Sequence, residues 1–261
     1  MVHTNGTKKT TQDIFLVFYK LVQSTGFLNT YFGRSIFEMF YLLYKKRFET
    51  TSIDLLKTFV KPGAFVIDVG ANIGFFTLNF ANWVSKGGKV LAFEPEKINY
   101  ERLKKNIRRN KVSESVKAYN MAVSEGFGEA LLEINPLHPG DHKLGEEGIP
   151  VKVTSIDYFL NEHKWTEVSL IKIDVQGAEA KVISGAVKTL KKYKPALFIE
   201  VDDSNLQNYG SSAKALLQFC ELFGYVVHLL EKGTISPPIC LDSAVSIALE
   251  SGYKDFLLLP S

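Results

Sequence analysis

The sequence predicts an α/β protein with a Rossmann-like, mostly parallel sheet of seven strands and helices on both faces. Short apolar runs alternate with amphipathic helical segments, the order that crossover connections between parallel strands produce. Two of these runs end in an acidic residue beside a turn, where Rossmann-like sheets bind ligands. The expected strands lie near 64–69, 89–94, 116–119, 168–174, 195–201, 225–230 and 255–259, the last two forming an antiparallel edge. The expected helices lie near 53–60, 74–84, 96–109, 178–192 and 211–223.

Residues 1–50 are expected to form an N-terminal helical extension ahead of a main domain at 51–261. Apolar and aromatic residues recur at helical spacing between positions 13 and 48, which predicts two amphipathic helices. We expect these helices to form an accessory layer packed on the main domain. Peripheral membrane contact is the alternative, because the basic residues at 45–47 follow the aromatic stripe.

The stretch 65–77 predicts a buried strand, a glycine turn and the start of a helix. Gly70 and Gly74 allow a tight turn and a close approach of the backbone to a ligand. Asp68, at the end of the strand, would repel a pyrophosphate bound at the helix N-terminus. The glycine spacing also differs from the dinucleotide pattern G-x-G-x-x-G. A ligand that carries an ammonium and a sulfonium, such as S-adenosylmethionine, suits this acid better.

A second acid, Glu94, ends the next apolar run and is followed by Pro95. About twenty residues after the glycine turn, a carboxylate in a Rossmann-like sheet accepts hydrogen bonds from ribose hydroxyls. NAD also carries free ribose hydroxyls, so Glu94 alone leaves an NAD-dependent oxidoreductase open. Asp68 and Glu94 together favour S-adenosylmethionine.

Three motifs of the chain resemble those of the FkbM family of S-adenosylmethionine-dependent methyltransferases. They are Asp68-Val-Gly-Ala-Asn-Ile-Gly-Phe-Phe-Thr77, Ala92-Phe-Glu-Pro95 and Ile171-Lys-Ile-Asp-Val-Gln-Gly-Ala-Glu179. Gln176 is a small departure, since the family often has glutamate there. The resemblance covers roughly 60–260 and implies a class I methyltransferase fold and O-methylation of a sugar, glycan or secondary-metabolite hydroxyl. It implies that the following residues bind the methyl donor: Asp68, Gly70, Ala71, Asn72, Gly74, Thr77, Glu94, Pro95 and Asp174.

Asn120, Met121 and Ala122 follow the third expected strand. By position they should border the adenine ring, with Met121 packing on it and Asn120 or backbone groups meeting its amine. A methionine after a strand is also a common core residue. We therefore predict an adenine contact here, with core packing as the alternative for Met121.

The acid–base residues should come from strand ends, because the reaction centre of an open α/β sheet lies beyond them. Methyl transfer to a hydroxyl needs an aligned acceptor and benefits from a base that removes its proton. Asp174 ends the fourth strand, so it is predicted to contact the donor, orient the acceptor or act as that base. Glu179 is a second catalytic candidate, or else only an acid that favours the start of its helix.

The segment 124–167 is predicted to be an insertion that contains a β-hairpin of 130–134 and 149–154. His142, near its tip, is a further candidate for the base, with an exposed loop histidine as the alternative. His138 and Asp141 lack the spacing that is diagnostic of metal ligands, so no metal is predicted.

Composition excludes several other classes of protein. A net charge of +3 is too small to indicate nucleic-acid binding, and the basic residues of 97–111 read as a solvated helix face. Cys220 and Cys240 have no metal-like or redox-like spacing, so we expect reduced thiols in a cytoplasmic protein without signal peptide or spanning helix. N-methylation of a peptide or amino sugar, and a noncatalytic module that binds S-adenosylmethionine, stay open as alternatives.

Overall fold

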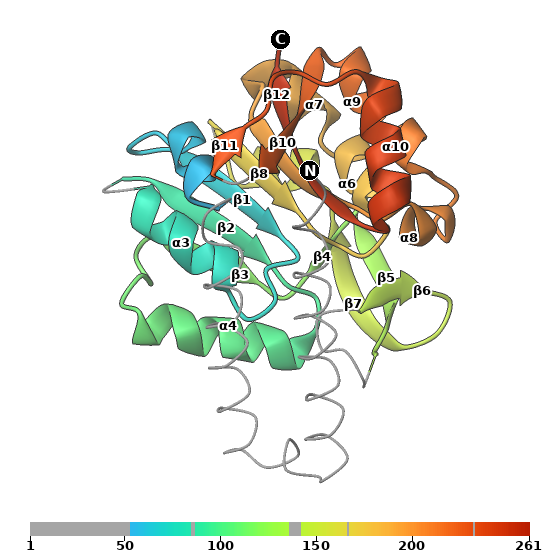
Figure 1. The fold of residues 1–261 in the computed structure, drawn as a ribbon. Coiled ribbons are helices and arrows are strands. Elements are labelled where there is room, and N and C mark those ends of the chain that lie inside the picture. Colours follow the sequence, from blue (N-terminus) through green and yellow to red (C-terminus); the bar gives the residue numbers. More distant parts are fainter. Residues whose placement is uncertain (1–52, 85–86, 136–141, 166, 232) are drawn as a thin grey trace, which may run out of the picture. The chain divides into compact units, whose positions relative to one another are not determined.

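The computed structural model describes residues 53–84, 87–135, 142–165, 167–231 and 233–261 (Figure 1). The chain divides into two units, Met1–Ile53 and Asp54–Ser261, and the elements named below belong to the second. The predictions for the N-terminal helices, their membrane contact and the boundary at residue 50 lie outside the described residues.

The main sheet has eight strands in the order β11-β10-β12-β9-β8-β1-β2-β3. Strands β1, β2, β3, β8 and β9 run parallel, whereas β12 runs antiparallel to both β9 and β10. The strands are β1 (Phe65–Val69), β2 (Lys89–Phe93), β3 (Val116–Tyr119), β8 (Leu170–Ile173), β9 (Ala196–Val201), β10 (Tyr225–Glu231), β11 (Thr234–Ile235) and β12 (Lys254–Pro260). All seven predicted strands and the antiparallel edge are confirmed, and the two-residue β11 is an addition at that edge.

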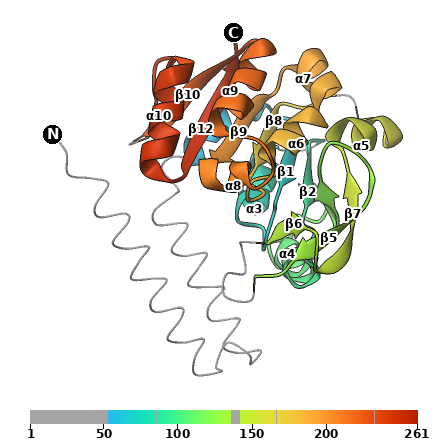
Figure 2. The same ribbon diagram turned by 90° about the vertical axis from the view of Figure 1, so that its right-hand side faces the viewer.

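Helices pack on both faces of this sheet (Figures 1 and 2). They are α3 (Phe75–Trp83), α4 (Lys97–Arg109), α5 (Ile156–Glu162), α6 (Glu179–Ser184), α7 (Val187–Tyr193), α8 (Asp203–Gln207), α9 (Ala213–Leu222) and α10 (Leu241–Ser251). A 3-10 helix, η2 (Lys57–Phe59), precedes β1. Helices α5, α8 and α10 were not among the predicted elements.

The predicted helix at 178–192 is broken into α6 and α7, which is a correction. Gly185 ends α6, and a Cβ there would lie 2.2 Å from the carbonyl oxygen of Ser124. The break therefore allows the loop after β4 (Ala122–Val123) to pass close to the helix backbone. Periodicity alone hides this break, because the apolar spacing continues through it.

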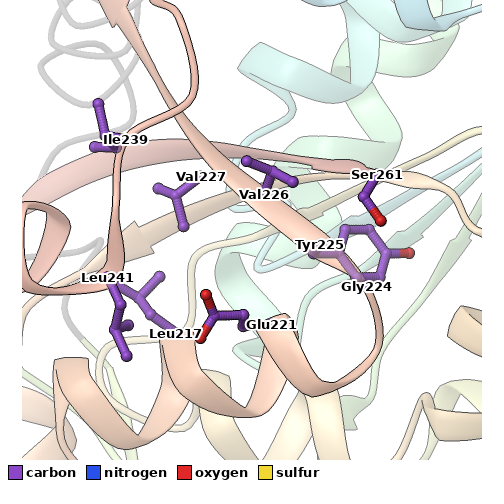
Figure 3. A pocket seen from close by; sticks show the side chains of 9 residues that line it. All are labelled: Leu217, Glu221, Gly224, Tyr225, Val226, Val227, Ile239, Leu241 and Ser261. Carbon is purple, nitrogen blue, oxygen red and sulfur yellow. The ribbon is translucent and has the colours of Figure 1, made fainter.

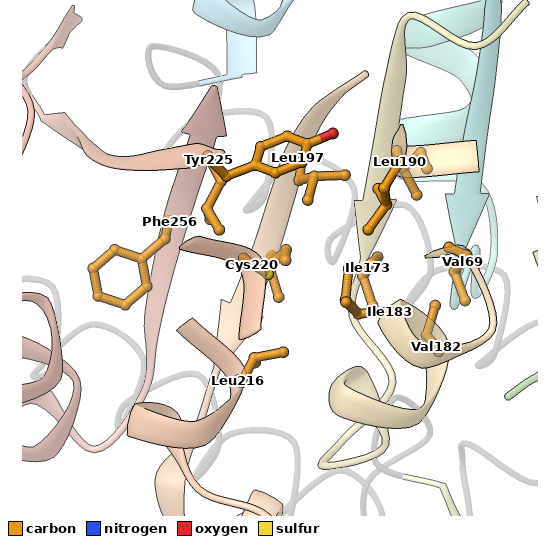
Figure 4. Packing of buried hydrophobic residues seen from close by; sticks show 14 of the residues in the cluster. Val69, Ile173, Val182, Ile183, Leu190, Leu197, Leu216, Cys220, Tyr225 and Phe256 are labelled. Carbon is orange, nitrogen blue, oxygen red and sulfur yellow. The ribbon is translucent and has the colours of Figure 1, made fainter. Parts of the chain in front are cut away.

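One face of the sheet packs against α5, α6, α7, α9 and α10 in the largest apolar cluster. Figure 4 shows part of it, with Ile173 and Leu197 from the sheet facing Ile183, Leu190 and Leu216 from the helices. Alternate residues of the same strands meet α3 on the other face, where the rings of Phe76 and Phe198 lie 5.7 Å apart. Burial on both faces explains why the strands read as continuous apolar runs.

The insertion is larger than the predicted hairpin and forms a second sheet in the order β4-β7-β5-β6. Strands β5 (Gly128–Glu133) and β7 (Ile149–Thr154) pair antiparallel as predicted, but β6 (Lys143–Gly145) pairs with the other edge of β5. Strand β4 pairs parallel with β7, and its Ala122 packs with Leu132 and Val151 in a small separate core. Strands of two or three residues carry no period that a sequence pattern reveals.

Cys220 and Cys240 are both free, as predicted. Within the parts of the chain that the structure describes, no helix combines the length and apolar character needed to cross a membrane.

Candidate active site

The turn after β1 is held between the ends of β2 and β8. The N–H groups of Gly70 and Ala71 both donate to the carbonyl oxygen of Phe93, at 3.0 and 2.9 Å. Gly70 has φ of 75°, and a Cβ there would lie 1.9 Å from the carbonyl oxygen of Asp174. Only glycine fits this position, so the turn lies directly against the end of β8.

Helix α4 fixes the other half of the turn. Gly74 is the N-cap of α3 with φ of 100°, and a Cβ there would lie 2.7 Å from Cδ1 of Leu103. Asn106 is buried in α4 and donates from Nδ2 to the carbonyl oxygen of Ile73, at 2.9 Å. The predicted solvated helix face is therefore the outer side of a helix whose inner side supports the glycine turn.

Asp68 is fully buried beneath this turn. Thr77, the predicted end of the first motif, donates its hydroxyl to Oδ2 of Asp68 at 2.5 Å. The other oxygen, Oδ1, has no hydrogen bond and lies 3.4 Å from Nζ of Lys172. Asp68 and Thr77 thus shape the turn from inside the protein, which differs from the direct ligand contact expected from the sequence.

Glu94 links the two loops that follow β1 and β2. Its Oε2 accepts the N–H of Asn72 at 2.8 Å, and its Oε1 accepts the N–H of Glu96 at 2.9 Å. The side chain is buried, and this desolvation raises the pKa of Glu94 to about 7 although both N–H groups favour the charged form. Each oxygen retains acceptor capacity toward a ligand, as a ribose-binding carboxylate requires.

Asn120 supports the loop that carries Glu94. Its Nδ2 donates to the carbonyl oxygens of Glu94 and Pro95, at 2.9 and 2.7 Å. Met121 is partly buried against the main apolar cluster, and Ala122 is buried in the small core of the insertion. The structure therefore gives these three residues supporting contacts, and the Ala122 side chain is turned into a core.

Asp174 follows β8, and its side chain is 24% exposed. Its N–H donates to the carbonyl oxygen of Val69 at 3.2 Å, which places it beside the glycine turn. Its Oδ2 lies 3.3 Å from Nζ of Lys172. The predicted proximity of Asp174 to the turn after β1 is confirmed, and its partial exposure leaves it accessible to an acceptor.

Gln176 connects Asp174 to β9 and α8. Its φ is 55°, and its Nε2 lies 3.5 Å from Oδ1 of Asp174 and 3.4 Å from Oε1 of Glu200. Nδ2 of Asn205 donates to Oε1 of Gln176 at 3.3 Å, and Lys143 of β6 donates to Oδ1 of Asn205 at 2.6 Å. Tyr209 anchors β6 as well, through a 2.6 Å bond from its hydroxyl to the carbonyl oxygen of Leu144.

Glu179 is the first residue of α6 and is 3% exposed. Its Oε1 accepts the N–H groups of Val175 and Gly177 at 3.3 and 3.1 Å, whereas Oε2 is buried without a hydrogen bond. Burial raises the pKa of Glu179 to about 7, and the nearby charge of Asp174 acts in the same direction. Glu179 therefore organises the loop that carries Gln176, and it is accessible to a ligand less directly than Asp174.

His142 lies immediately before β6, where its Nδ1 accepts the N–H of Asn135 at 3.1 Å. This bond joins the two chain ends that flank 136–141. The other tip residues that were considered as ligands, His138 and Asp141, lie outside the described residues. Within the described ranges, no three His, Cys, Asp or Glu side chains are grouped closely enough to hold a metal ion.

Four polar residues of this arrangement were missed by sequence reasoning as site residues: Lys172, Glu200, Asn205 and Lys143. Lys172 carried a usable signal, since it is a charge in an otherwise apolar strand. The others come from β9, α8 and β6, and their meeting depends on tertiary structure alone.

A cavity of about 200 Å³ lies elsewhere, between α9, β10 and the segment before α10 (Figure 3). Tyr225, in its lining, begins β10, and its hydroxyl donates to the carbonyl oxygen of Pro195, just before β9. Because β9 and β10 run in the same direction, this cavity borders the amino ends of the strands. It is thus at the opposite edge from Asp174 and Glu94.

Comparison with known proteins gives a consistent result. The model of the Methyltransferase FkbM domain matches residues 68–227, more than half of the chain. The chain is 28% identical to Methyltransferase sdnD of Sordaria araneosa, over 55% of this chain and 67% of that protein. It is 28% identical to hexuronic acid methyltransferase AglP of Haloferax volcanii (59% and 64% covered) and 29% identical to 31-O-demethyl-FK506 methyltransferase FkbM of Streptomyces tacrolimicus (48% and 60% covered).

The matches therefore span about two thirds of the length of these relatives. Among solved structures, the chain resembles methyltransferase FkbM of Methylobacillus flagellatus, with 20% identity and a TM-score of 0.48 over 76% of this chain and 44% of that one.

Proposed function

This chain belongs to the FkbM family of methyltransferases, and on that premise we propose that it transfers a methyl group from S-adenosylmethionine to a hydroxyl group. The acceptor we propose is a sugar, a glycan or a secondary metabolite. The match to the methyltransferase domain carries the choice of S-adenosylmethionine over NAD. Glu94, a buried acid at the end of β2 that bonds the loops after β1 and β2, supplies the carboxylate for the ribose. The relative named for a 31-O-demethyl compound supports an oxygen acceptor, and the relative named for a hexuronic acid supports a sugar acceptor.

The residues around the glycine turn fit this methyl donor. Glu94 would accept hydrogen bonds from the ribose hydroxyls, and the backbone from Gly70 to Asn72 would hold the methionine part. The loop that Asn120 supports would border the adenine. When bound, S-adenosylmethionine supplies an electrophilic methyl group.

On the acceptor side, Asp174 is the residue that we assign to the hydroxyl proton. It is partly exposed, follows a central strand, and lies 3.3 Å from the ammonium of Lys172. Gln176 donates toward Asp174 and Glu200, so the two carboxylates have a fixed spacing at the ends of β8 and β9. Carboxylates held in this way suit an acceptor with several hydroxyl groups, because each oxygen accepts a hydrogen bond.

The test is a methyl-transfer screen with labelled S-adenosylmethionine against matched pairs of hydroxyl and amine acceptors. We expect labelled product from polyhydroxylated acceptors, and loss of it in Asp174→Asn without loss of donor binding. Transfer only to the amines would overturn the O-methylation proposal. Donor binding without transfer to any acceptor would instead support the noncatalytic module.

A further inference from the structure

Lys172 is a buried lysine at the end of β8, with its side chain 3% exposed. Its Nζ donates to the carbonyl oxygen of Gly70 at 2.8 Å and to that of Val69 at 3.3 Å. It also lies 5.1 Å from the centre of the Phe76 ring. Burial of an ammonium is costly unless it is paired and hydrogen-bonded, so this position is built around the charge.

Two carboxylates share this ammonium. The fully buried Asp68 lies 3.4 Å from Nζ of Lys172, and the partly exposed Asp174 lies 3.3 Å from it. The two carboxylate oxygens are therefore within roughly 7 Å of each other, a separation at which like charges in a buried site repel. The ammonium between them offsets that repulsion.

We propose that Lys172 is a positioning residue that keeps Asp174 ionised and seats the glycine turn against β8. The effect of Lys172 on the charge of Asp174 follows from the two ion pairs. The importance of that charge for methyl transfer rests on the proposed function. Without the ammonium, the buried Asp68 charge would oppose ionisation of Asp174, and the carbonyl oxygen of Gly70 would lose its shortest bond to β8.

The other ionisable groups around Asp174 reinforce this need. Glu200 of β9 is an acid whose negative charge opposes ionisation of Asp174, and Glu179 of α6 adds to this opposition at the higher pH where it is itself charged. Lys143 of β6 acts in the opposite sense, but it reaches Asp174 through Asn205 and Gln176. Lys172 is in direct contact with the Asp174 carboxylate and so has a larger effect on its charge than Lys143.

The test is a pH titration of the aspartate carboxyl carbons by NMR in the free protein, with Asp174→Asn identifying the Asp174 signal. In Lys172→Met we expect the protonation midpoint of Asp174 to rise by about one pH unit or more. Adding Asp68→Asn to this variant removes the other buried charge and should lower the midpoint part of the way back, because Asp68 lies farther from Asp174 than Lys172 does. Lys188→Met, the same change at an exposed lysine of α7, should leave it unchanged.

An unchanged midpoint in Lys172→Met would overturn the proposal. Should Lys172→Met fail to fold, Asp68→Asn alone decides, because the unopposed ammonium must then lower the midpoint of Asp174. Methyl transfer and donor affinity are measured on the same variants. A coupled titration in a protein that methylates nothing would refute the proposed function and leave the role of Lys172 in setting the charge of Asp174 intact.

Discussion

The two halves of the candidate site are built in different ways. On the β1–β2 side, the key acid is held by backbone N–H groups, those of Asn72 and Glu96 on Glu94. On the β8–β9 side, backbone N–H groups hold the buried Glu179 in the same way, but side chains connect the more exposed residues, with Gln176 in contact with Glu200 and with Asn205. We call these the donor half and the acceptor half.

The difference indicates how one fold serves many substrates. Backbone groups keep their positions when side chains change, so the donor half is fixed by the path of the chain through the glycine turn. A side-chain network is altered by a single substitution, and it reaches the insertion through Lys143. A substitution in the acceptor half can therefore change its network and leave the donor half unchanged.

The largest effect is expected from Gly70→Ala in the donor half. The new Cβ would lie 1.9 Å from the carbonyl oxygen of Asp174, which forces the turn away from β8. Donor binding should be lost, and the free energy of unfolding should fall by more than about 3 kcal/mol. Gly210→Ala is the matched control, because Gly210 has φ of 71° but no atom near its Cβ position. It should cost only about 1–2 kcal/mol and keep donor binding.

Equal losses in the two glycine variants, measured by urea unfolding and calorimetry, would show that positive φ alone sets the requirement for glycine. The turn would then be independent of its contact with β8.

The second prediction compares two buried acids, Glu94 in the donor half and Glu179 in the acceptor half. Burial raises both pKa values from 4.5 to about 7, so the folded protein binds these protons more tightly than the unfolded chain does. Each group therefore costs no stability at low pH and up to roughly 3 kcal/mol as the pH rises from about 4.5 past 7. Glu94→Gln and Glu179→Gln should each flatten the decline in unfolding free energy between pH 5 and pH 8.

The two variants should differ in ligand binding, which sharpens the comparison. Glu94→Gln should weaken binding of the methyl donor, whereas Glu179→Gln should leave donor affinity near the wild-type value. A variant that is no more stable than the wild type at pH 8 would contradict the assignment of a buried, proton-binding carboxyl at that position.

Asp174→Asn should reduce turnover by about 10²-fold, equivalent to about 2.7 kcal/mol of transition-state stabilisation. The amide is nearly isosteric and the side chain is partly exposed, so the fold should persist. Single-turnover rate and donor affinity are measured on the same variant. A loss seen first in donor affinity would move Asp174 into the donor half, and near-normal values for both would remove it from the site.

The smallest effect is expected from Asn205→Ala in the acceptor half. The variant removes the link between Lys143 and Gln176. The free energy of acceptor binding should then weaken by about 1 kcal/mol, which appears as a several-fold rise in KM for the acceptor. Donor affinity should not change. A variant whose donor affinity falls as much as its acceptor affinity would mean that the two halves are not separate.

This contrast also explains what the sequence could predict. Local patterns of residues close along the chain predict the strand ends and the positions of Gly70, Gly74 and Glu94. The structure places these residues near one another, as those patterns require. The inward turn of Asp68 was missed, because its partner Lys172 lies more than a hundred residues away. A period-2 pattern does not distinguish a carboxylate that faces a ligand from one that faces a buried lysine.

The acceptor half was less predictable for the same reason. Asn205 and Lys143 come from a five-residue helix and a three-residue strand, which are too short to produce a periodic signal. Their contact depends on how the insertion packs against α8, and no spacing along the chain encodes that packing. The pKa of histidine makes His142 a candidate base, but the sequence does not predict its contact with Asn135, which depends on the path of the chain into β6.

The most direct test of this account is a calorimetric titration of S-adenosylhomocysteine, with NAD as the competing ligand, into the wild-type protein, Glu94→Ala and Asn205→Ala. The account predicts binding to the wild type, a loss of about 1–3 kcal/mol in Glu94→Ala from the missing charge-assisted hydrogen bonds, and no change in Asn205→Ala. Tight binding of NAD with no response to S-adenosylhomocysteine, or an unchanged affinity in Glu94→Ala, would contradict it.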